Sequence, residues 1–240
     1  MTRPTALPCL LLAAGRGERM RPLTDDLPKP LLKIKGKALL SWHLEALSKA
    51  GITNVVINHA WLGEKIENAL GNGSQFGLQI TYSPEMNALE TAGGICQALP
   101  LLDPHDYFLV INGDIFCPNF PMDHLLDEFT RLERLADPHK PLAHLILVPN
   151  PVQHPEGDFY LLDSQASDSV LPDAEKLTFS GIGLYHRDLF KDLVRGEPTK
   201  LAPLLRAAMR ENRVTAEKYT GPWHDVGTPQ RLNELNAAHE

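Results

Sequence analysis

Residues 10–24 read LLLAAGRGERMRPLT, an unbroken apolar run followed by a loop rich in glycine and arginine. A short apolar run of this kind is typical of a strand that is covered on both faces. The loop that follows shows no helical periodicity, so we expect it to leave the strand at its carboxyl end. Ligands of open α/β sheets bind at this end of the strands. The segment therefore predicts an α/β fold with a ligand site at the loop.

Three further apolar runs of the same character lie at residues 55–57, 108–111 and 145–148. Between the runs, apolar residues recur at helical spacing, as at Leu40 and Leu44. Because predicted strands alternate with predicted helices, the sequence favours an α/β fold with a mostly parallel, Rossmann-like central sheet flanked by helices.

The pattern changes after Pro149, where proline-rich loops precede a predicted hairpin at 159–162 and a predicted strand at 177–185. The chain then continues with an amphipathic helix that begins at residue 201. No flexible linker separates the two parts. We therefore expect a single domain over residues 1–240, with a first half of about 1–120 and a second, smaller lobe within about 121–240.

The composition argues against several classes of protein. The 23 basic and 30 acidic residues give a formal net charge of −7, so general attraction to nucleic acid or anionic lipid is not expected. No segment approaches the roughly 20 apolar residues of a membrane span. The three cysteines are widely spaced, as is typical of buried thiols in a reducing compartment. We therefore expect a cytoplasmic protein with no nucleic-acid or membrane partner.

The loop after the first strand has the composition of a phosphate-binding loop. Its small residues, which let backbone N–H groups approach a phosphate closely, are Ala13, Ala14, Gly15 and Gly17. Arg16, Arg19 and Arg21 add positive charge. The dinucleotide fingerprint is excluded because Met20 stands where a third glycine is needed, and the chain has no P-loop Gly-Lys-Ser/Thr.

A single Gly-x-Gly is more often an ordinary turn, but residues 28–31 read PKPL and strengthen the functional interpretation. The two prolines stiffen the backbone on both sides of Lys29 and so direct its side chain. The loop ending in Arg-x-x-Pro-Leu-Thr and the Pro-Lys-Pro-Leu after it resemble the sugar nucleotidyltransferase superfamily. The resemblance implies that Arg19 neutralises the leaving pyrophosphate and that Lys29 lies beside the α-phosphate.

Two carboxylates stand at positions that suit Mg²⁺. Asp114 follows the predicted strand at 108–111, and Asp225 lies between a short predicted strand and a helix. Either residue alone is as often a turn residue or a helix cap. Mg²⁺ takes a few hard oxygen ligands and keeps several waters, so two carboxylates that meet phosphates suit it. Both match the superfamily's metal ligands, and the resemblance therefore implies Mg²⁺ at Asp114 and Asp225, with Asp114 catalytic beside Arg19 and Lys29.

Residues 89–94 read LETAGG, where the superfamily has a Leu-Gly-Thr-Ala-Gly element that contacts the nucleoside. Glu90 replaces the usual glycine, which predicts a reshaped base or sugar pocket. The residues implied to bind the nucleotide are Ala13, Ala14, Gly15, Gly17, Arg19, Lys29, Asn58, Leu89, Thr91, Gly93 and Asn112. The residues expected to contact the sugar from the second lobe are Asn150, Asp158, Ser180 and Gly181.

Four other segments indicate which group of enzymes within the superfamily this sequence resembles. Residues 57–63, 157–159, 178–182 and 223–228 look like the short bacterial N-acetylmuramate 1-phosphate uridylyltransferases of cell-wall sugar recycling. This implies UTP and N-acetylmuramate 1-phosphate as substrates, with UDP-N-acetylmuramate and pyrophosphate as products. A mannose 1-phosphate guanylyltransferase, a glucose 1-phosphate nucleotidyltransferase and a catalytically silent nucleotide-sugar sensor stay open as alternatives. Because the arginine, the lysine and both aspartates are present, the sequence favours an active enzyme.

The superfamily's Glu-Lys-Pro sugar-phosphate element is incomplete here, because Leu177 follows Glu175-Lys176. Lys176 and Lys200 are both candidates to hold the sugar phosphate, and each is equally consistent with a solvated surface lysine. No residue pattern identifies a partner for the lactyl carboxylate of a muramic sugar.

Overall fold

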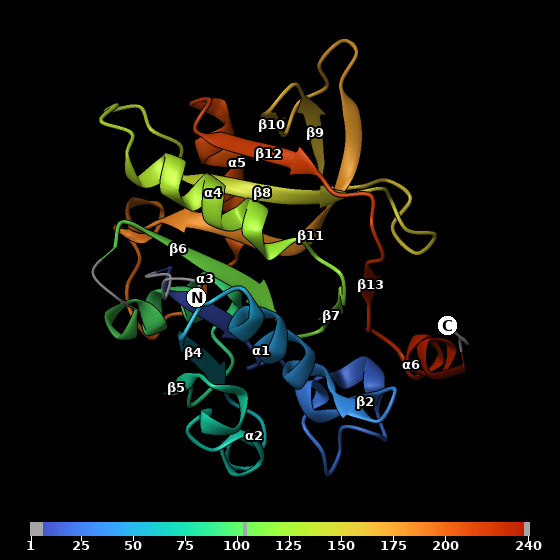
Figure 1. Ribbon diagram of the computed structural model, residues 1–240. Helices are drawn as coiled ribbons and strands as arrows, with labels where there is room; N and C mark the ends of the chain where they lie inside the picture. Colours follow the sequence, from blue (N-terminus) through green and yellow to red (C-terminus); the bar gives the residue numbers. More distant parts are fainter. Residues whose placement is uncertain (1–6, 103–104, 238–240) are drawn as a thin grey trace.

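The computed structural model describes residues 7–102 and 105–237, and within them it has one central sheet of nine strands (Figure 1). The first half contributes β1 (Cys9–Leu12), β4 (Asn54–His59), β5 (Gln79–Pro84) and β6 (Tyr107–Asn112). These strands are parallel and lie in the order β5-β4-β1-β6. Their carboxyl ends therefore reach the same edge of the sheet.

The second half continues this sheet with mixed strand directions. Its strands are β8 (Ala143–Val148), β9 (Phe159–Leu162), β10 (Gln165–Ser167), β11 (Glu175–His186) and β12 (Val214–Lys218). β11 joins the two halves and runs antiparallel to both β6 and β8, whereas β12 is parallel to β8. The predicted α/β fold is confirmed, but the parallel pattern is interrupted by β11. An apolar run indicates that a strand is buried, but it does not indicate the direction in which the strand runs. The sequence therefore did not reveal this reversal.

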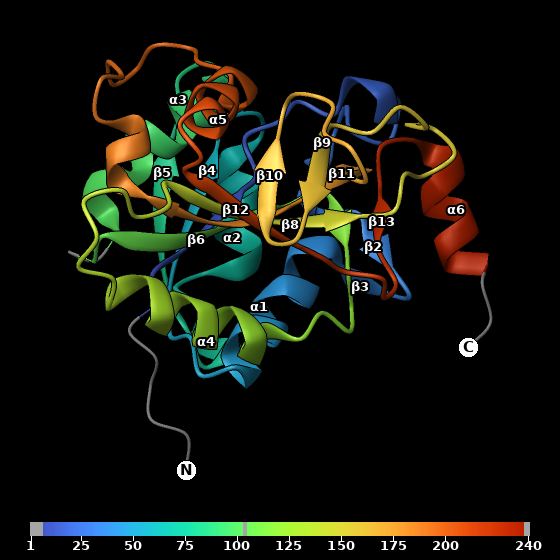
Figure 2. The same ribbon diagram turned by 90° about the horizontal axis from the view of Figure 1, so that it is seen from above.

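Helices cover both faces of the sheet, as Figure 2 shows. On one face lie α1 (Leu39–Lys49), α2 (Gly63–Leu70) and α4 (Met122–Glu133). On the other face lie α3 (Glu90–Ala98) and α5 (Leu201–Arg210). The sheet is therefore the middle one of three layers.

Strand β1 shows why this architecture requires an unbroken apolar run. Cys9 and Leu11 pack with apolar residues of α1, α2 and α4, while Leu10 packs with those of α3 and α5. All three side chains are fully buried. Complete burial of a leucine side chain contributes about 1.5–3 kcal/mol, so a strand covered on both faces gains from every position.

Strand β5 was not indicated by the sequence pattern. It lies at the edge of the sheet and alternates buried with exposed residues, so it has no apolar run.

None of the helices within residues 7–102 and 105–237 has the length and apolar composition needed to cross a membrane.

The remaining elements are η1 (Glu18–Met20), η2 (Lys29–Leu31), β2 (Lys33–Ile34), β3 (Lys37–Ala38), η3 (Ser74–Phe76), η4 (Leu99–Leu101), β7 (Ile115–Phe116), η5 (Arg187–Phe190), β13 (His224–Asp225) and α6 (Pro229–Ala237).

A third apolar cluster connects the glycine-rich loop with the C-terminal segment. Met20 of η1, Phe116 of β7 and Leu232 of α6 are buried in this cluster. Helix α6 thus packs on the loop that leaves β1, across the boundary between the two predicted halves.

Candidate active site

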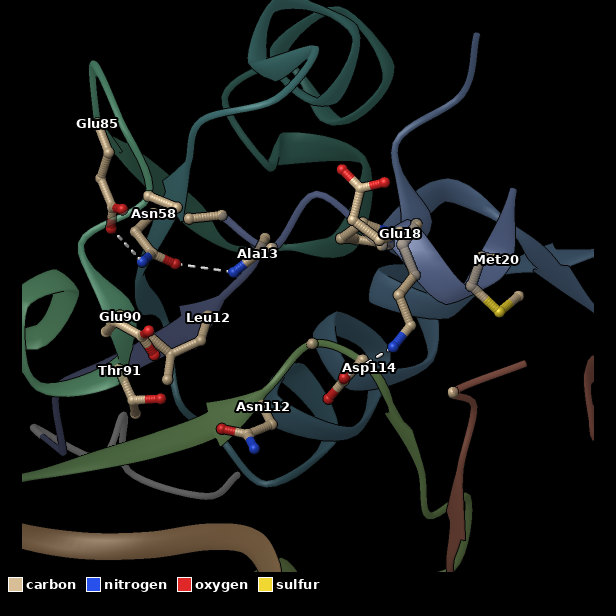
Figure 3. A pocket seen from close by; sticks show the side chains of 18 of the residues that line it. Leu12, Ala13, Glu18, Met20, Asn58, Glu85, Glu90, Thr91, Asn112 and Asp114 are labelled. Atoms are coloured by element: carbon tan, nitrogen blue, oxygen red, sulfur yellow. Dashed lines mark hydrogen bonds and ion pairs between the residues drawn. The ribbon is translucent and has the colours of Figure 1, made fainter. Parts of the chain in front are cut away.

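The carboxyl ends of β1, β4 and β6 open into a cavity of about 480 Å³, seen in Figure 3. Asn58 and Asn112 enter it together because each is paired with Leu12 at the end of β1. The residues of the sequence prediction that line this cavity are Ala13, Ala14, Gly15, Gly17, Arg19, Lys29, Asn58, Leu89, Thr91, Asn112 and Asp114. We call this space the first cavity.

The two glycines of the loop serve different purposes. Gly17 has a φ of 69°, and a Cβ there would lie 3.1 Å from side-chain atoms of both Lys29 and Thr24. The positive φ and the close approach both favour glycine. A Cβ at Gly15 would meet no atom within 4 Å. Gly17 therefore shapes the loop, whereas Gly15 leaves the backbone open to a ligand in the cavity.

Arg16 holds the loop in place. Its guanidinium donates hydrogen bonds to the Thr24 carbonyl at 2.8 Å and to the Asp25 carboxylate at 3.3 Å. It also lies 3.9 Å from the centroid of the Trp61 ring, and the Trp61 indole N–H donates to the Thr24 carbonyl at 3.1 Å. A cation–π contact of this kind contributes about 0.5–1 kcal/mol at an exposed site. Arg16 and Trp61 thus fix the loop against the segment that follows β4.

The other two loop arginines differ in their partners. Arg21 donates to the Asp25 carboxylate at 2.7 Å and lies 3.7 Å from that of Glu18, and it does not line the cavity. Arg19 does line the cavity, and it forms no hydrogen bond or ion pair with any other described residue. Guanidinium groups form strong, directed hydrogen bonds with phosphate oxygens. Arg19 is therefore the loop arginine whose charge stays available to a phosphate.

Lys29 stands at the start of η2, between Pro28 and Pro30, and its side chain is only 9% exposed. Its Nζ lies 2.7 Å from Oδ2 of Asp114, whose side chain is 41% exposed. A buried ammonium group needs such a partner because desolvation of an unpaired charge is costly. The pair places a cation and a partly accessible carboxylate at one end of the cavity.

A buried hydrogen-bond network fixes the opposite end. The Asn58 carbonyl accepts from the backbone N–H of Ala13 at 2.7 Å, and the Asn58 amide donates to Glu85 at 2.6 Å. The second Glu85 oxygen accepts from the backbone N–H of Leu89 at 3.0 Å. Asn58 thus uses its side chain to position the loop after β1 against the segment before α3.

Glu85 is a residue of the cavity that the sequence analysis did not single out. It is 7% exposed, and burial raises the pKa of its carboxyl, while hydrogen bonds from Leu89 and Asn58 oppose this rise. It directly follows β5, so it belongs to the same sheet edge as the other lining residues. Recognition of β5 as a strand would have revealed it.

Gly93, a predicted nucleotide contact, has a packing role that the sequence pattern did not indicate. Gly93 is absent from the cavity lining, and its N–H donates to the Thr199 carbonyl at 3.1 Å. A Cβ at this position would lie 2.5 Å from the Glu197 carbonyl oxygen. Glycine is therefore required at position 93 because α3 packs closely on the backbone of residues 197–199, whereas Leu89, Glu90 and Thr91 do line the cavity.

A second cavity, of about 220 Å³, lies on the other side of Asn112. Asn112 and Asp114 line both cavities, so the two spaces are adjacent. Ser180 and Gly181, predicted to contact the sugar, line this second cavity. Gly181 has a φ of 85°, and a Cβ there would lie 2.8 Å from the Asn112 side chain. Its lack of a side chain lets β11 approach the end of β6.

The other two predicted sugar contacts, Asn150 and Asp158, are not in the lining of the second cavity. Asn150 donates to the backbone carbonyls of Pro155 and Lys176 and accepts from the Thr178 hydroxyl. These hydrogen bonds hold the loop at 149–158 against β11. Neither Lys176 nor Lys200 lines either cavity.

Asp158 supports a residue that does line the second cavity. One of its carboxylate oxygens accepts from the Phe179 backbone N–H at 2.8 Å, and the other lies 3.0 Å from Nε2 of His154. His154 is part of the lining, together with Gln153. His154 was not among the predicted site residues, although it stands four residues before Asp158 in the same loop.

Asp114 and Asp225 come together through the short ribbon of β7 and β13. Ile115 pairs with Asp225, and the Val226 N–H donates to the Asp114 carbonyl at 3.0 Å. Both carboxylates line the second cavity, and Nη1 of Arg231 lies 2.5 Å from Oδ2 of Asp225.

Residues 7–102 and 105–237 contain no group of three or more His, Cys, Asp or Glu that could hold a metal. Two carboxylates fit Mg²⁺, which completes its shell with water and phosphate oxygens.

His43 of α1 supports this ribbon from inside the protein. Its Nε2 lies 2.9 Å from the Ile115 carbonyl, which places the proton on Nε2. Burial lowers the pKa of His43 to about 4, so the ring is neutral near pH 7. The strand that follows Asp114 is thus held by a neutral, buried hydrogen-bond donor.

Comparison with known proteins identifies the class to which this fold and site belong. Residues 9–156 match the family model described as nucleotidyl transferase. The chain belongs to the nucleotidyl transferase family. It is 52% identical, over 95% of its length and 96% of the relative's, to N-acetylmuramate alpha-1-phosphate uridylyltransferase of Neisseria meningitidis serogroup B. It is 31% identical, over 92% of both chains, to the Caulobacter vibrioides protein of the same name.

More distant relatives share the fold. Mannose-1-phosphate guanyltransferase of Gibberella zeae is 29% identical over 92% of this chain and 61% of its own length. Among solved structures, a Bacillus anthracis protein in complex with sucrose has a TM-score of 0.79 at 22% identity, over 96% of this chain and 94% of that one. At this level of identity the structural likeness supports the fold alone.

Proposed function

We propose that this protein transfers the uridylyl group of UTP to N-acetylmuramate 1-phosphate, forming UDP-N-acetylmuramate and pyrophosphate. The observation that carries the proposal is the 52% identity, across nearly the whole of both chains, to the meningococcal protein named for this activity. The reaction would belong to cell-wall sugar recycling. Because it consumes UTP, we place it in the cytoplasm.

The proposed chemistry depends on positioning and charge rather than on a general base. A phosphate oxygen of the sugar 1-phosphate attacks the α-phosphorus of UTP, and the bond from that phosphorus to the bridging oxygen of the β-phosphate breaks. The attacking oxygen is already anionic near neutral pH, so no residue has to remove a proton. Phosphoryl-transfer sites of this kind act by orienting the reactants and offsetting charge.

The arrangement of cations in the first cavity supports two separate roles. Lys29 is buried and fixed beside Asp114, which suits a charge that stays at the α-phosphate during the reaction. Arg19 lines the cavity without a partner among the described residues, which suits a charge that follows the leaving pyrophosphate. The open backbone at Gly15 adds N–H donors to the same cavity.

We propose Asp114 and Asp225 as the ligands of Mg²⁺. When bound, the ion would offset negative charge on the phosphate oxygens. The protein's own contribution is to hold the two carboxylates at the junction of the cavities, through the pairing of β7 with β13 and the contacts from Lys29 and Arg231.

The second cavity is the proposed site of the sugar. It shares Asn112 and Asp114 with the first cavity, so a sugar there would have its phosphate close to the proposed site of the α-phosphate. Ser180, Gly181, Gln153 and His154 offer it polar groups. Asn150 and Asp158 act indirectly in this proposal, because their hydrogen bonds shape the loop that carries His154.

The proposal is tested by pyrophosphate release in the presence of Mg²⁺. UTP and GTP are each combined with N-acetylmuramate, mannose and glucose 1-phosphates, and Asp114→Ala is the inactive control. We expect release with UTP and N-acetylmuramate 1-phosphate. Turnover only with GTP and mannose 1-phosphate would keep the chemistry and contradict the substrates, whereas nucleotide binding without turnover on any pair would contradict enzymatic function.

A further inference from the structure

Glu90 has a backbone conformation that glutamate rarely adopts. Its φ is 59°, in the left-handed region, and it is the first residue of α3. A side chain with a Cβ is strained there, whereas glycine is not. Such strain persists only where the surrounding structure enforces it, and it clusters at functional sites.

The Glu90 side chain belongs to the first cavity and is unpaired there. It is exposed, lines the cavity and forms no hydrogen bond or ion pair with another described residue. In Figure 3 it lies on the same wall as Thr91, between Asn58 with Glu85 on one side and Asn112 on the other. Glu85, the neighbouring carboxylate, is already bonded to Asn58 and Leu89. Glu90 is therefore the carboxylate of this wall that is free to accept hydrogen bonds from a ligand.

The chemistry of a nucleoside triphosphate indicates which of its groups the Glu90 carboxylate could bind. A carboxylate repels the triphosphate, and it accepts hydrogen bonds without donating any. Uracil offers a single N–H between two carbonyl oxygens, which makes a poor partner for a carboxylate. The ribose offers two neighbouring hydroxyl donors that match the two carboxylate oxygens, as acidic residues do in dinucleotide-binding sites.

We propose that the Glu90 carboxylate binds the 2′- and 3′-hydroxyls of the nucleotide's ribose and thereby selects ribonucleotides over deoxyribonucleotides. The proposal rests on the proposed nucleotidyl transfer, since it assigns Glu90 to the nucleotide that occupies the first cavity. The strained glutamate replaces the conformationally suitable glycine because it adds this recognition.

The test compares wild type with Glu90→Gly and Glu90→Gln, using UTP, 2′-deoxy-UTP and 3′-deoxy-UTP. For wild type we expect kcat/KM and binding affinity to favour UTP over each deoxy analogue by about tenfold, the scale of one hydrogen bond to an exposed charged group. In Glu90→Gly the preference should fall to near one, while the Tm rises by about 2–4 °C because glycine relieves the strain. Glu90→Gln keeps the strain and should retain part of the preference without the rise in Tm.

Three outcomes would overturn the proposal. One is an unchanged ratio between UTP and its deoxy analogues in Glu90→Gly, in which case a rise in Tm would show a purely structural residue. Another is a changed preference between UTP and GTP, which would assign the carboxylate to the base. The third is an effect confined to KM of the sugar phosphate.

The proposed function and the ribose contact fail separately in this design. If only GTP supports turnover, the same ratios are measured with GTP and 2′-deoxy-GTP, and their collapse in Glu90→Gly would still support the ribose contact. Calorimetric titration of the nucleotides without sugar phosphate measures the same ratios without turnover.

Discussion

The two cavities on either side of Asn112 differ in what their polar side chains already contact. In the first cavity, Arg19 and Glu90 have no partner among the described residues, and Lys29 and Asp114 pair with each other. Beside the second cavity, Asn150 and Asp158 have both ends of their side chains bonded within the protein.

This difference separates side chains that meet a ligand from those that shape its site. A polar group that is fully bonded within the protein gains little from a further partner, whereas an uncommitted charge in a cavity gains much. The first cavity therefore holds charged side chains that remain available to a ligand, and the second is formed largely by loops that polar residues hold in place.

Replacement of the buried cation tests the first cavity most severely. Lys29→Met keeps the aliphatic packing and removes the charge, so we expect kcat to fall about 10²–10³-fold, as for the loss of a group that stabilises the transition state. Lys37→Met is the matched control, because Lys37 pairs with Glu45 outside both cavities, and it should change kcat less than twofold. Steady-state pyrophosphate release measures both. A loss of less than fivefold in Lys29→Met would remove Lys29 from the chemistry.

Acidification tests the buried support of the ribbon formed by β7 and β13. The folded-state pKa of His43 is about 4 against an ordinary value of 6.5, so between these values the unfolded chain binds more protons. The contribution of His43 to stability is therefore complete above pH 6.5 and is lost as the pH falls towards 4. The lost free energy of unfolding amounts to about 3 kcal/mol.

Urea unfolding at a series of pH values measures this contribution. His43→Gln keeps a donor for the Ile115 carbonyl and should be less sensitive to acid than wild type. Burial also lowers the pKa of His144 and His186 in the second half, but these groups are common to both proteins and cancel in the difference. Equal slopes for wild type and His43→Gln would contradict the prediction.

The loop arginines offer the sharpest matched pair. Arg19→Gln removes the uncommitted charge of the first cavity and should lower kcat/KM about 10–100-fold. Arg21→Gln removes an arginine two positions away that pairs with Asp25 and Glu18, and it should change kcat/KM less than threefold. Similar losses in both variants would show that the partners of an arginine do not decide its role.

The smallest effect is expected at the second cavity. Asp158→Ala removes the acceptor for the Phe179 N–H and the partner of His154, so the loop that carries His154 should loosen. We expect KM for the sugar 1-phosphate to rise about tenfold or less, the effect of about one lost hydrogen bond, with KM for the nucleotide unchanged. Asp192→Ala, at an exposed carboxylate, is the control for both constants. An equal rise in KM for the nucleotide would show that the two cavities are not independent.

The fold class and most residues of the first cavity could be predicted from the amino-acid pattern. The apolar run of β1 required a strand covered on both faces, and the carboxyl ends of parallel strands necessarily meet at one sheet edge. Small residues, prolines and isolated charges beside such strands are local signals, so Gly15, Gly17 and Lys29 could be found from the chain alone. The narrower assignment came from resemblance, which the 52% identity to the meningococcal relative supports.

How these groups are used became visible in the folded chain. It showed that β11 runs antiparallel between β6 and β8, that Gly93 packs on residues 197–199 and that Glu85 joins the first cavity from β5. It also separated Arg19 from Arg16 and Arg21 and revealed the left-handed backbone of Glu90. Strand direction, close packing and the pairing of charges all depend on partners that are distant in sequence. A local pattern shows which groups a segment carries, whereas their remaining capacity to bind a ligand depends on what the folded chain has already placed against them.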